Sequence, residues 1–318
     1  MVPQTAQTLH ITNGDSVIYT FKKAGILGTH IAWRDLLHDG PVPGGIPLES
    51  LSRIRGRYLS SRGLGNPIKV LHEFEARDAA FRRAARFQEI VLWFEHDLFD
   101  QLQLAQILCE LHAMRLEPGR VSIVQSDNYL GNMAADELVA LLPKRRTVTT
   151  TLLDAGLHAW NALTSPDPLD LETHTKTDVA GLPFMRAALE RLCEEYPWKI
   201  DGLSRSERQA LQAVSQGPAR NDELFRRSQA REDASFLGDA PFSALLNDLR
   251  HRYALVEGEE GALFPSALGR RVLAGDADLL EEMPIDRWIG GVHLCGRDVT
   301  RWDDDSSTFT ATRDAAAT

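Results

Sequence analysis

Residues 89–111 read EIVLWFEHDLFDQLQLAQILCEL, an apolar run followed by a polar turn and then a helical pattern. The run Glu89–Phe94 is rich in β-branched and aromatic residues, which is typical of a buried strand. The turn consists of Glu95, His96 and Asp97. Apolar residues then recur three or four positions apart, at Leu98, Leu102, Ala105, Leu108 and Leu111. This strand, turn and helix together predict an α/β protein.

Three other apolar runs resemble the first, and polar loop residues follow each of them. They are Leu9–Thr12, Thr29–Trp33 and Arg120–Val124. Helical spacing lies between the runs, at Leu48, Leu51, Ile54, Tyr58 and Leu59, and again at Phe74, Phe81, Ala84 and Phe87. Strands that alternate with helices predict a mostly parallel, Rossmann-like sheet covered on both sides. We assign this α/β domain to residues 1–145.

The rest of the chain has a different pattern, and we divide it into three parts. Residues 146–202 are predicted to be bridging helices, with an irregular connector over 166–182. Residues 203–275 show three helices, a hairpin around Glu257–Gly261 and a last helix, which is the outline of a winged helix. The expected helix caps are Ser204, Asn221 and Ser266, and Asp239 is expected to start the third helix.

The tail, residues 276–318, is acidic, with ten Asp or Glu against four Arg. Its segment Trp288–Leu294 is expected to form a strand that packs back on the body. The last dozen residues are expected to be disordered.

Charge and cysteine content limit the classes of function. The formal net charge of −10 disfavours a general nucleic-acid or anionic-membrane binder, because both need a positive surface. Cys109, Cys193 and Cys295 form no CxxC pair, which argues against a structural zinc site and a disulfide framework. We find no signal peptide and no run of roughly 20 apolar residues, so we expect a cytoplasmic protein.

The loops after the four predicted strands are unusually polar, and ligands of open parallel sheets bind at that edge. We therefore predict a small-molecule site there, for a nucleotide or another phosphate compound. The predicted ligand-binding residues are Asn13, Asp15, Ser16, Asp35, His38, Asp39 and Asp127. The same residue types are also ordinary helix caps and turn formers, which is the competing interpretation.

An enzyme at this edge would draw its catalytic group from His96, Glu95 and Asp97. His96 would be the general acid and base, and Asp15, Asp39 and Glu95 would orient it or hold a divalent cation. The dipeptides His38-Asp39 and His96-Asp97 suit Mg, Mn or Fe, so a metal-dependent hydrolase is one hypothesis, with the identity of the metal left open.

Two other chemistries fit the sequence less well. An esterase based on Ser16 would need a late Asp-x-x-His pair, whereas the one found here is Asp35 and His38. No dinucleotide fingerprint follows the first strand.

Two groups of arginines add a possible phosphate site. They are Arg53, Arg55, Arg57 and Arg62, and then Arg77, Arg82, Arg83 and Arg86. Either group could hold a phosphate near the strand ends. The alternative is that both form solvated helix faces that pair with local acids.

The winged-helix-like part suggests a different function, a ligand-sensing regulatory or adaptor protein. Its third helix offers only Ser243 and Asn247 for base contacts, and residues 203–275 carry ten basic and ten acidic side chains. The predicted hairpin tip contains Glu257, Glu259 and Glu260, which phosphates would repel. A protein partner, or packing on the first domain, is therefore favoured over DNA.

Three motifs resemble the bacterial domain of unknown function 1835 family. They are Leu9-His-Ile-Thr-Asn-Gly-Asp15, Trp33-Arg-Asp-Leu-Leu-His-Asp-Gly-Pro41 and Trp93-Phe-Glu-His-Asp-Leu-Phe-Asp-Gln101. The resemblance covers roughly residues 8–130 and extends loosely through 182–184, 202–207 and 290–293. It implies a family but no activity. Its members need not have a serine after the aspartate, which further weakens the esterase hypothesis for Ser16.

Overall fold

The computed structural model describes residues 7–177, 181–259 and 261–310, and its centre is a five-stranded sheet. The strand order is β2-β1-β4-β5-β6, in which the first four strands are parallel and β6 is antiparallel. The bounds are β1 (Thr8–Thr12), β2 (Thr29–Ala32), β4 (Glu89–Glu95), β5 (Val121–Ser126) and β6 (Arg146–Thr147). The predicted α/β class and the mostly parallel sheet are therefore confirmed.

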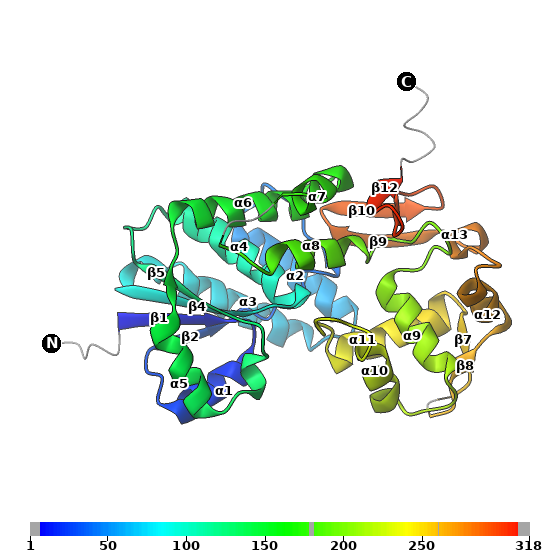
Figure 1. Cartoon of the computed structure of the whole chain (residues 1–318), viewed down its shortest axis with the longest axis horizontal. Helices are drawn as coiled ribbons and strands as arrows, with labels where there is room; N and C mark the ends of the chain where they lie inside the picture. Colours follow the sequence, from blue (N-terminus) through cyan, green and yellow to red (C-terminus); the bar gives the residue numbers. More distant parts are fainter. Residues whose placement is uncertain (1–6, 178–180, 260, 311–318) are drawn as a thin grey trace, which may run out of the picture.

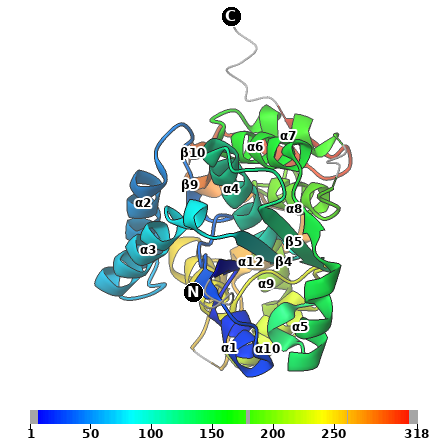
Figure 2. The ribbon, with the colours of Figure 1, turned by 90° about the vertical axis from the view of Figure 1, so that its left-hand side faces the viewer.

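Helices cover both faces of this sheet (Figures 1 and 2). Along β4, Ile90, Leu92 and Phe94 belong to the main core, whereas Val91 and Trp93 belong to a second cluster. Successive strand residues face opposite sides, so an unbroken apolar run needs cover on both. The second cluster includes residues of α1 (Asp15–Ala24) and α5 (Ala135–Leu141). The main core includes α4 (Leu98–Met114), on which α6 (Thr150–Thr164) and α8 (Met185–Cys193) pack.

Helices α2 (Leu48–Ser61) and α3 (Pro67–Phe81) pack on each other and close the β2 side of the main core. The predicted helix through Phe74 begins and ends earlier than its apolar spacing suggested. It begins at Pro67 because the Asn66 side chain accepts the amide N–H groups of Ile68 and Lys69. It ends at Phe81, and Ala84 lies in a separate 3₁₀ turn.

The C-terminal half contains three helices, a two-stranded hairpin and two further helices. They are α9 (Arg205–Ser215), α10 (Asn221–Gln229), α11 (Asp239–Asn247), β7 (Val256–Glu257), β8 (Phe264–Pro265), α12 (Ala267–Ala274) and α13 (Leu279–Glu282). Ser204 and Ser266 cap α9 and α12 as predicted. Asp239 is the first residue of α11, as predicted. Asn221 is the first residue of α10, one position after the N-cap, so that prediction was wrong. Glu260 lies outside the described residues.

The tail returns to the first half of the chain, as predicted, but residues 288–294, predicted as one strand, contain the turn between two strands. It forms β9 (Ile285–Gly290) and β10 (Val292–Gly296), and β9 pairs in parallel with β3 (Gly40–Pro41). The turn packs so closely that a Cβ on Gly290 would lie 2.2 Å from the Leu163 carbonyl oxygen. Gly290 also has a φ of +57°, which favours glycine.

Two predictions for irregular segments need correction. The connector over 166–182 contains α7 (Pro168–Thr175), whose N-terminus the Asp167 side chain caps; residues 178–180 lie outside the described part. Within the last dozen residues, β12 (Thr308–Thr310) pairs with β11 (Arg301–Asp303), so that stretch is ordered. Residues 311–318 lie outside the described part. Among the helices that are described, none is long and apolar enough to cross a membrane.

Candidate functional site

The edge at which the parallel strands end brings three loops together. Strand β1 lies between β2 and β4. Helix α1, which follows β1, and helix α4, which follows β4, belong to different core clusters and so cover opposite faces of the sheet. Ligands of open α/β sheets bind at such a point. Here the Asn13 side-chain amide donates to Asp100, 87 positions later, over 2.7 Å. The Leu130 N–H, beyond β5, donates to Glu95 over 2.7 Å.

Three buried carboxylates lie at this point, and we call Glu95, Asp97 and Asp100 the acidic cluster. One oxygen from each lies within 4.8 Å of the others, and their residues are 4%, 3% and 0% exposed. The strand-to-helix turn builds this arrangement. Asp97 caps α4 by accepting the Asp100 N–H over 3.0 Å, and Asp100 accepts the Glu95 N–H over 2.7 Å.

Burial raises the pKa values of all three groups, and repulsion from neighbouring carboxylates adds to this for Glu95 and Asp100. Burial raises the pKa of Glu95 to about 7 and that of Asp97 to about 6. Burial, with the charges of Asp97 and Glu95, raises the pKa of Asp100 well above its usual range. The hydrogen bonds that they accept come from neutral amides. A bound cation would offset the cost of ionising such a cluster.

The donor atoms of the acidic cluster fit a hard divalent cation. Asn13 lies beside the cluster, and its buried Oδ1 has no hydrogen-bond partner among the described residues. Its amide nitrogen is the group that donates to Asp100. Oxygen donors of this kind suit Mg²⁺, Mn²⁺ or Ca²⁺. Sequence reasoning placed Glu95, Asp97 and Asn13 at this edge but left Asp100 out of the predicted site.

His96 lies in a different environment from the acidic cluster. Its ring centroid is 5.2 Å from that of Tyr129 and 6.0 Å from that of Phe184. It lines a cavity of about 200 Å³ that residues of α8 and of segment 232–234 also line. Burial lowers its pKa, which favours the neutral imidazole. The predicted catalytic residues are thus separated: Glu95 and Asp97 lie in the acidic cluster, and His96 lies outside it. Neighbouring residues at the end of a strand point to opposite sides of the sheet.

Asp15 and Ser16 belong to the first turn of α1, where the sequence predicted a loop. Asp15 pairs with Arg34 through two hydrogen bonds of 2.6 Å, which lower the pKa of the Asp15 carboxyl. Ser16 lies against the loop after β5, since a Cβ on Gly131 would be 2.9 Å from its Oγ. Asp127 is exposed at the same edge and accepts the Asn128 side-chain amide.

Asp35 is buried in the core of the folded chain. It forms an ion pair of 2.9 Å with Arg55, and the two side chains are 1% and 0% exposed. Arg55 also donates to the carbonyl oxygens of Leu36 and Asp39. Arg77 is buried as well and donates to the Trp33 carbonyl and to Ser52. We therefore correct three expectations: Asp35 has no open face for a ligand, and Arg55 and Arg77 lie neither at a phosphate site nor on a solvated face.

His38 and Asp39 line a second cavity, of about 260 Å³, between the two halves of the chain. Tyr58 and Arg62 line it from the first half; Glu195, Glu207, Phe236, Arg287 and Trp288 line it from the rest of the chain. Asp39 accepts the Tyr58 hydroxyl over 2.7 Å. The His38 ring lies edge-on to Phe236, and burial lowers its pKa to about 4. These two predicted residues are thus at an interface that sequence reasoning did not foresee.

The comparisons with known proteins leave function to the geometry. No protein-family model matches this chain, and no curated protein is significantly similar to it. Two sites therefore remain to be interpreted from their own chemistry, the acidic cluster at the strand ends and the cavity between the halves.

Proposed function

We propose that this chain binds a divalent cation at the acidic cluster and, through it, a small anionic molecule such as a phosphate compound or nucleotide. The observation that carries the proposal is the convergence of three buried carboxylates, to one of which the Asn13 amide donates. Buried acids at such close quarters are costly unless a proton or a cation compensates them. Their position, where β1 and β4 diverge, is where open α/β sheets bind ligands.

The proposed reaction is metal-dependent hydrolysis of a phosphate ester. A cation held there would supply a Lewis acid for the phosphoryl oxygens and lower the pKa of a bound water. The chain itself supplies the start of α1, where Gly14 provides no side-chain cap, so the first N–H groups can donate hydrogen bonds to an anion. Asn13, the residue just before, holds the acidic cluster in place through Asp100.

A ligand-sensing regulatory or adaptor protein is the second candidate, and the cavity between the halves favours it. A molecule in that cavity would touch His38 and Asp39 on one side and Phe236 and Arg287 on the other. Binding of this molecule would therefore change how the two halves of the chain are positioned relative to each other. We propose that α9–α12 with β7 and β8 form a winged-helix-like domain that contacts a protein, since Glu257 and Glu259 near the hairpin disfavour DNA.

We further propose membership of the domain of unknown function 1835 family, a Rossmann-like class for the sheet, and a cytoplasmic location. The three sequence motifs support the first, and the strand order supports the second. Three free cysteines support the third. The boundaries at 145, 202 and 275 remain predictions.

We expect Glu95→Gln and Asp97→Asn each to weaken Mn²⁺ binding at least about tenfold, because each removes a charged ligand. Without cation the same variants should be as stable as the wild type or more so, since each removes a buried charge. Asp127→Asn, an exposed change at the same edge, is the matched control. Mn²⁺ titration followed by calorimetry or electron paramagnetic resonance measures the first effect, and urea unfolding measures the second.

The same proteins separate the two candidate functions. Mn²⁺-dependent release of phosphate from a simple phosphomonoester, lost in both variants and kept in Asp127→Asn, supports the hydrolase. Stabilisation by a nucleotide without turnover supports the sensor. Wild-type Mn²⁺ affinity in both Glu95→Gln and Asp97→Asn would refute the cation site.

A further inference from the structure

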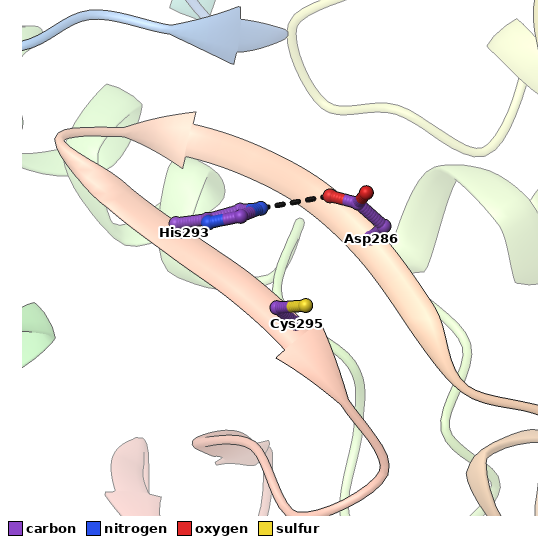
Figure 3. Close-up of side chains that lie close together, drawn as sticks. All are labelled: Asp286, His293 and Cys295. Atoms are coloured by element: carbon purple, nitrogen blue, oxygen red, sulfur yellow. Dashed lines mark hydrogen bonds and ion pairs between the residues drawn. The ribbon is translucent and has the colours of Figure 1, made fainter.

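The hairpin of β9 and β10 carries three metal-binding side chains on one of its faces. Asp286 on β9 is the register partner of Cys295 on β10, and His293 lies two residues before Cys295. Alternate residues of a strand share a face, so all three project to the same side. Figure 3 shows them gathered there, with the His293 ring directed at Asp286. One donor atom from each lies within 4.8 Å of the others.

The imidazole of this group is held in place before any ion binds. His293 Nε2 lies 2.7 Å from Asp286 Oδ1. The Trp288 ring stacks on it, with centroids 4.4 Å apart and an angle of 2° between planes. Its register partner is Trp288, so the pairing of the two strands fixes this stack. The Asp286 carboxylate, the His293 imidazole and the Cys295 thiol are all exposed, so an ion can reach them from solvent.

From this geometry we propose that Asp286, His293 and Cys295 form a site for Zn²⁺. A thiolate and an imidazole select a borderline ion over Mg²⁺ or Ca²⁺. Catalytic zinc sites have three protein ligands and leave the fourth coordination position open, whereas structural zinc sites have four protein ligands. Donor atoms around one tetrahedral ion are about 3.5 Å apart. Small side-chain rotations would bring the present set to that spacing.

The open position gives this site access to a small molecule. Asp286 and Trp288 also line the cavity between the halves, so the ion lies at the edge of that cavity. Tyr58, Phe236 and Tyr253 supply it with aromatic surface. The fourth zinc ligand is therefore a water or a small anionic or neutral donor that enters from the cavity. This inference uses none of the residues of the acidic cluster, and it stands or falls independently of the proposed function.

Co²⁺ is the probe for the site, because a cobalt–thiolate bond absorbs strongly in the near ultraviolet. We expect one equivalent of Co²⁺ to give this absorption in the full chain and Zn²⁺ to abolish it. Cys295→Ser should remove the absorption, and His293→Ala should weaken Zn²⁺ binding at least about tenfold in competition with a chromophoric chelator. Cys109→Ser and His251→Ala are the matched controls and should behave as the wild type.

Azide then tests the open position. We expect azide to shift the visible bands of the cobalt protein, because it displaces the fourth ligand; unchanged bands would refute the open position. Near-ultraviolet absorption that persists in Cys295→Ser, or Zn²⁺ affinity that is equal in His293→Ala and wild type, would overturn the site itself. Glu95→Gln should keep the cobalt absorption, and Cys295→Ser should keep Mn²⁺ binding, so failure of one site is not mistaken for failure of the other.

Discussion

Replacing Arg55 with alanine is expected to lower the free energy of unfolding by about 3–5 kcal/mol. The Arg55 and Asp35 side chains are almost fully buried and bond over 2.9 Å, so the variant leaves a buried carboxylate without its partner. It also removes the donors to the carbonyl oxygens of Leu36 and Asp39. Urea unfolding at neutral pH measures the loss.

Arg57→Ala is the control, because Arg57 is exposed on the same helix and its removal should change stability by no more than about 0.5 kcal/mol. The double variant Asp35→Ala, Arg55→Ala should cost less than the sum of the single changes, since no unpaired charge remains. Equal losses in Arg55→Ala and Arg57→Ala would show that the pair does not stabilise the fold.

The effect should extend to the cavity between the halves. Arg55 fixes the backbone of the loop that carries His38 and Asp39, through its bonds to Leu36 and Asp39. The same loop continues into β3, to which the tail strand β9 is bonded. The buried guanidinium of Arg55 on α2 thus sets the position of His38 and Asp39 in the cavity. It also sets the position of β3, the strand with which the tail strand β9 pairs.

The sheet could be predicted from the sequence because its strands are buried on both faces. In β4 the apolar run is unbroken, since Ile90 and Val91 face different cores. Helix α1 escaped prediction, although it covers one of those faces. Only Val17 and Phe21 are buried among its ten residues. Its first residues, Asp15 and Ser16, follow Asn13-Gly14, which is typical of a turn.

The site was predictable only where local rules decide it. Asp97 and Asp100 lie within a single strand-to-helix turn, and the parallel sheet then brings Asn13 to them. Asp35, in contrast, is neutralised by Arg55 from α2, and neither residue type reveals that pairing in the sequence. His38 and Asp39 leave the strand-end edge because β9, about 250 positions later, pairs beside them.

The proposed zinc ligands on β9 and β10 are a second example of residues that sequence patterns do not bring together. Cys295 was found without a CxxC partner, and a sequence pattern for structural zinc excluded it from consideration. Its partners become apparent only from the register of β9 with β10, which sets Asp286 across from it. Pattern rules describe four-ligand sites close in sequence, whereas three ligands on two strands depend on strand register.

As the pH is lowered from about 6.5 to about 4, His38 is expected to lower the free energy of unfolding by about 3 kcal/mol. Burial lowers the pKa of His38 from 6.5 to about 4 in the folded chain. Between these values the unfolded chain binds a proton at His38 that the folded chain does not, so acid favours unfolding. Above about pH 6.5 the His38 ring is neutral in both the folded and the unfolded chain, so it costs no stability there.

In His38→Gln, the slope of unfolding free energy against pH should be less positive than in the wild type over this window. The difference should be the equivalent of up to one bound proton. The variant's stability at pH 7 should drop only modestly, because His38 Nδ1 has no hydrogen-bond partner among the described residues. The comparison rests on the difference between the two slopes, because other groups titrate in the same window and persist in the variant. Burial lowers the pKa of His10 to about 4, which adds to the loss in acid, whereas the raised pKa values of Glu95 and Asp97 oppose it. His72→Gln, an exposed change, should follow the wild-type profile. Equal slopes in His38→Gln and wild type between pH 4 and 6.5 would mean that His38 accepts a proton in the folded chain, as a ring open to the cavity could.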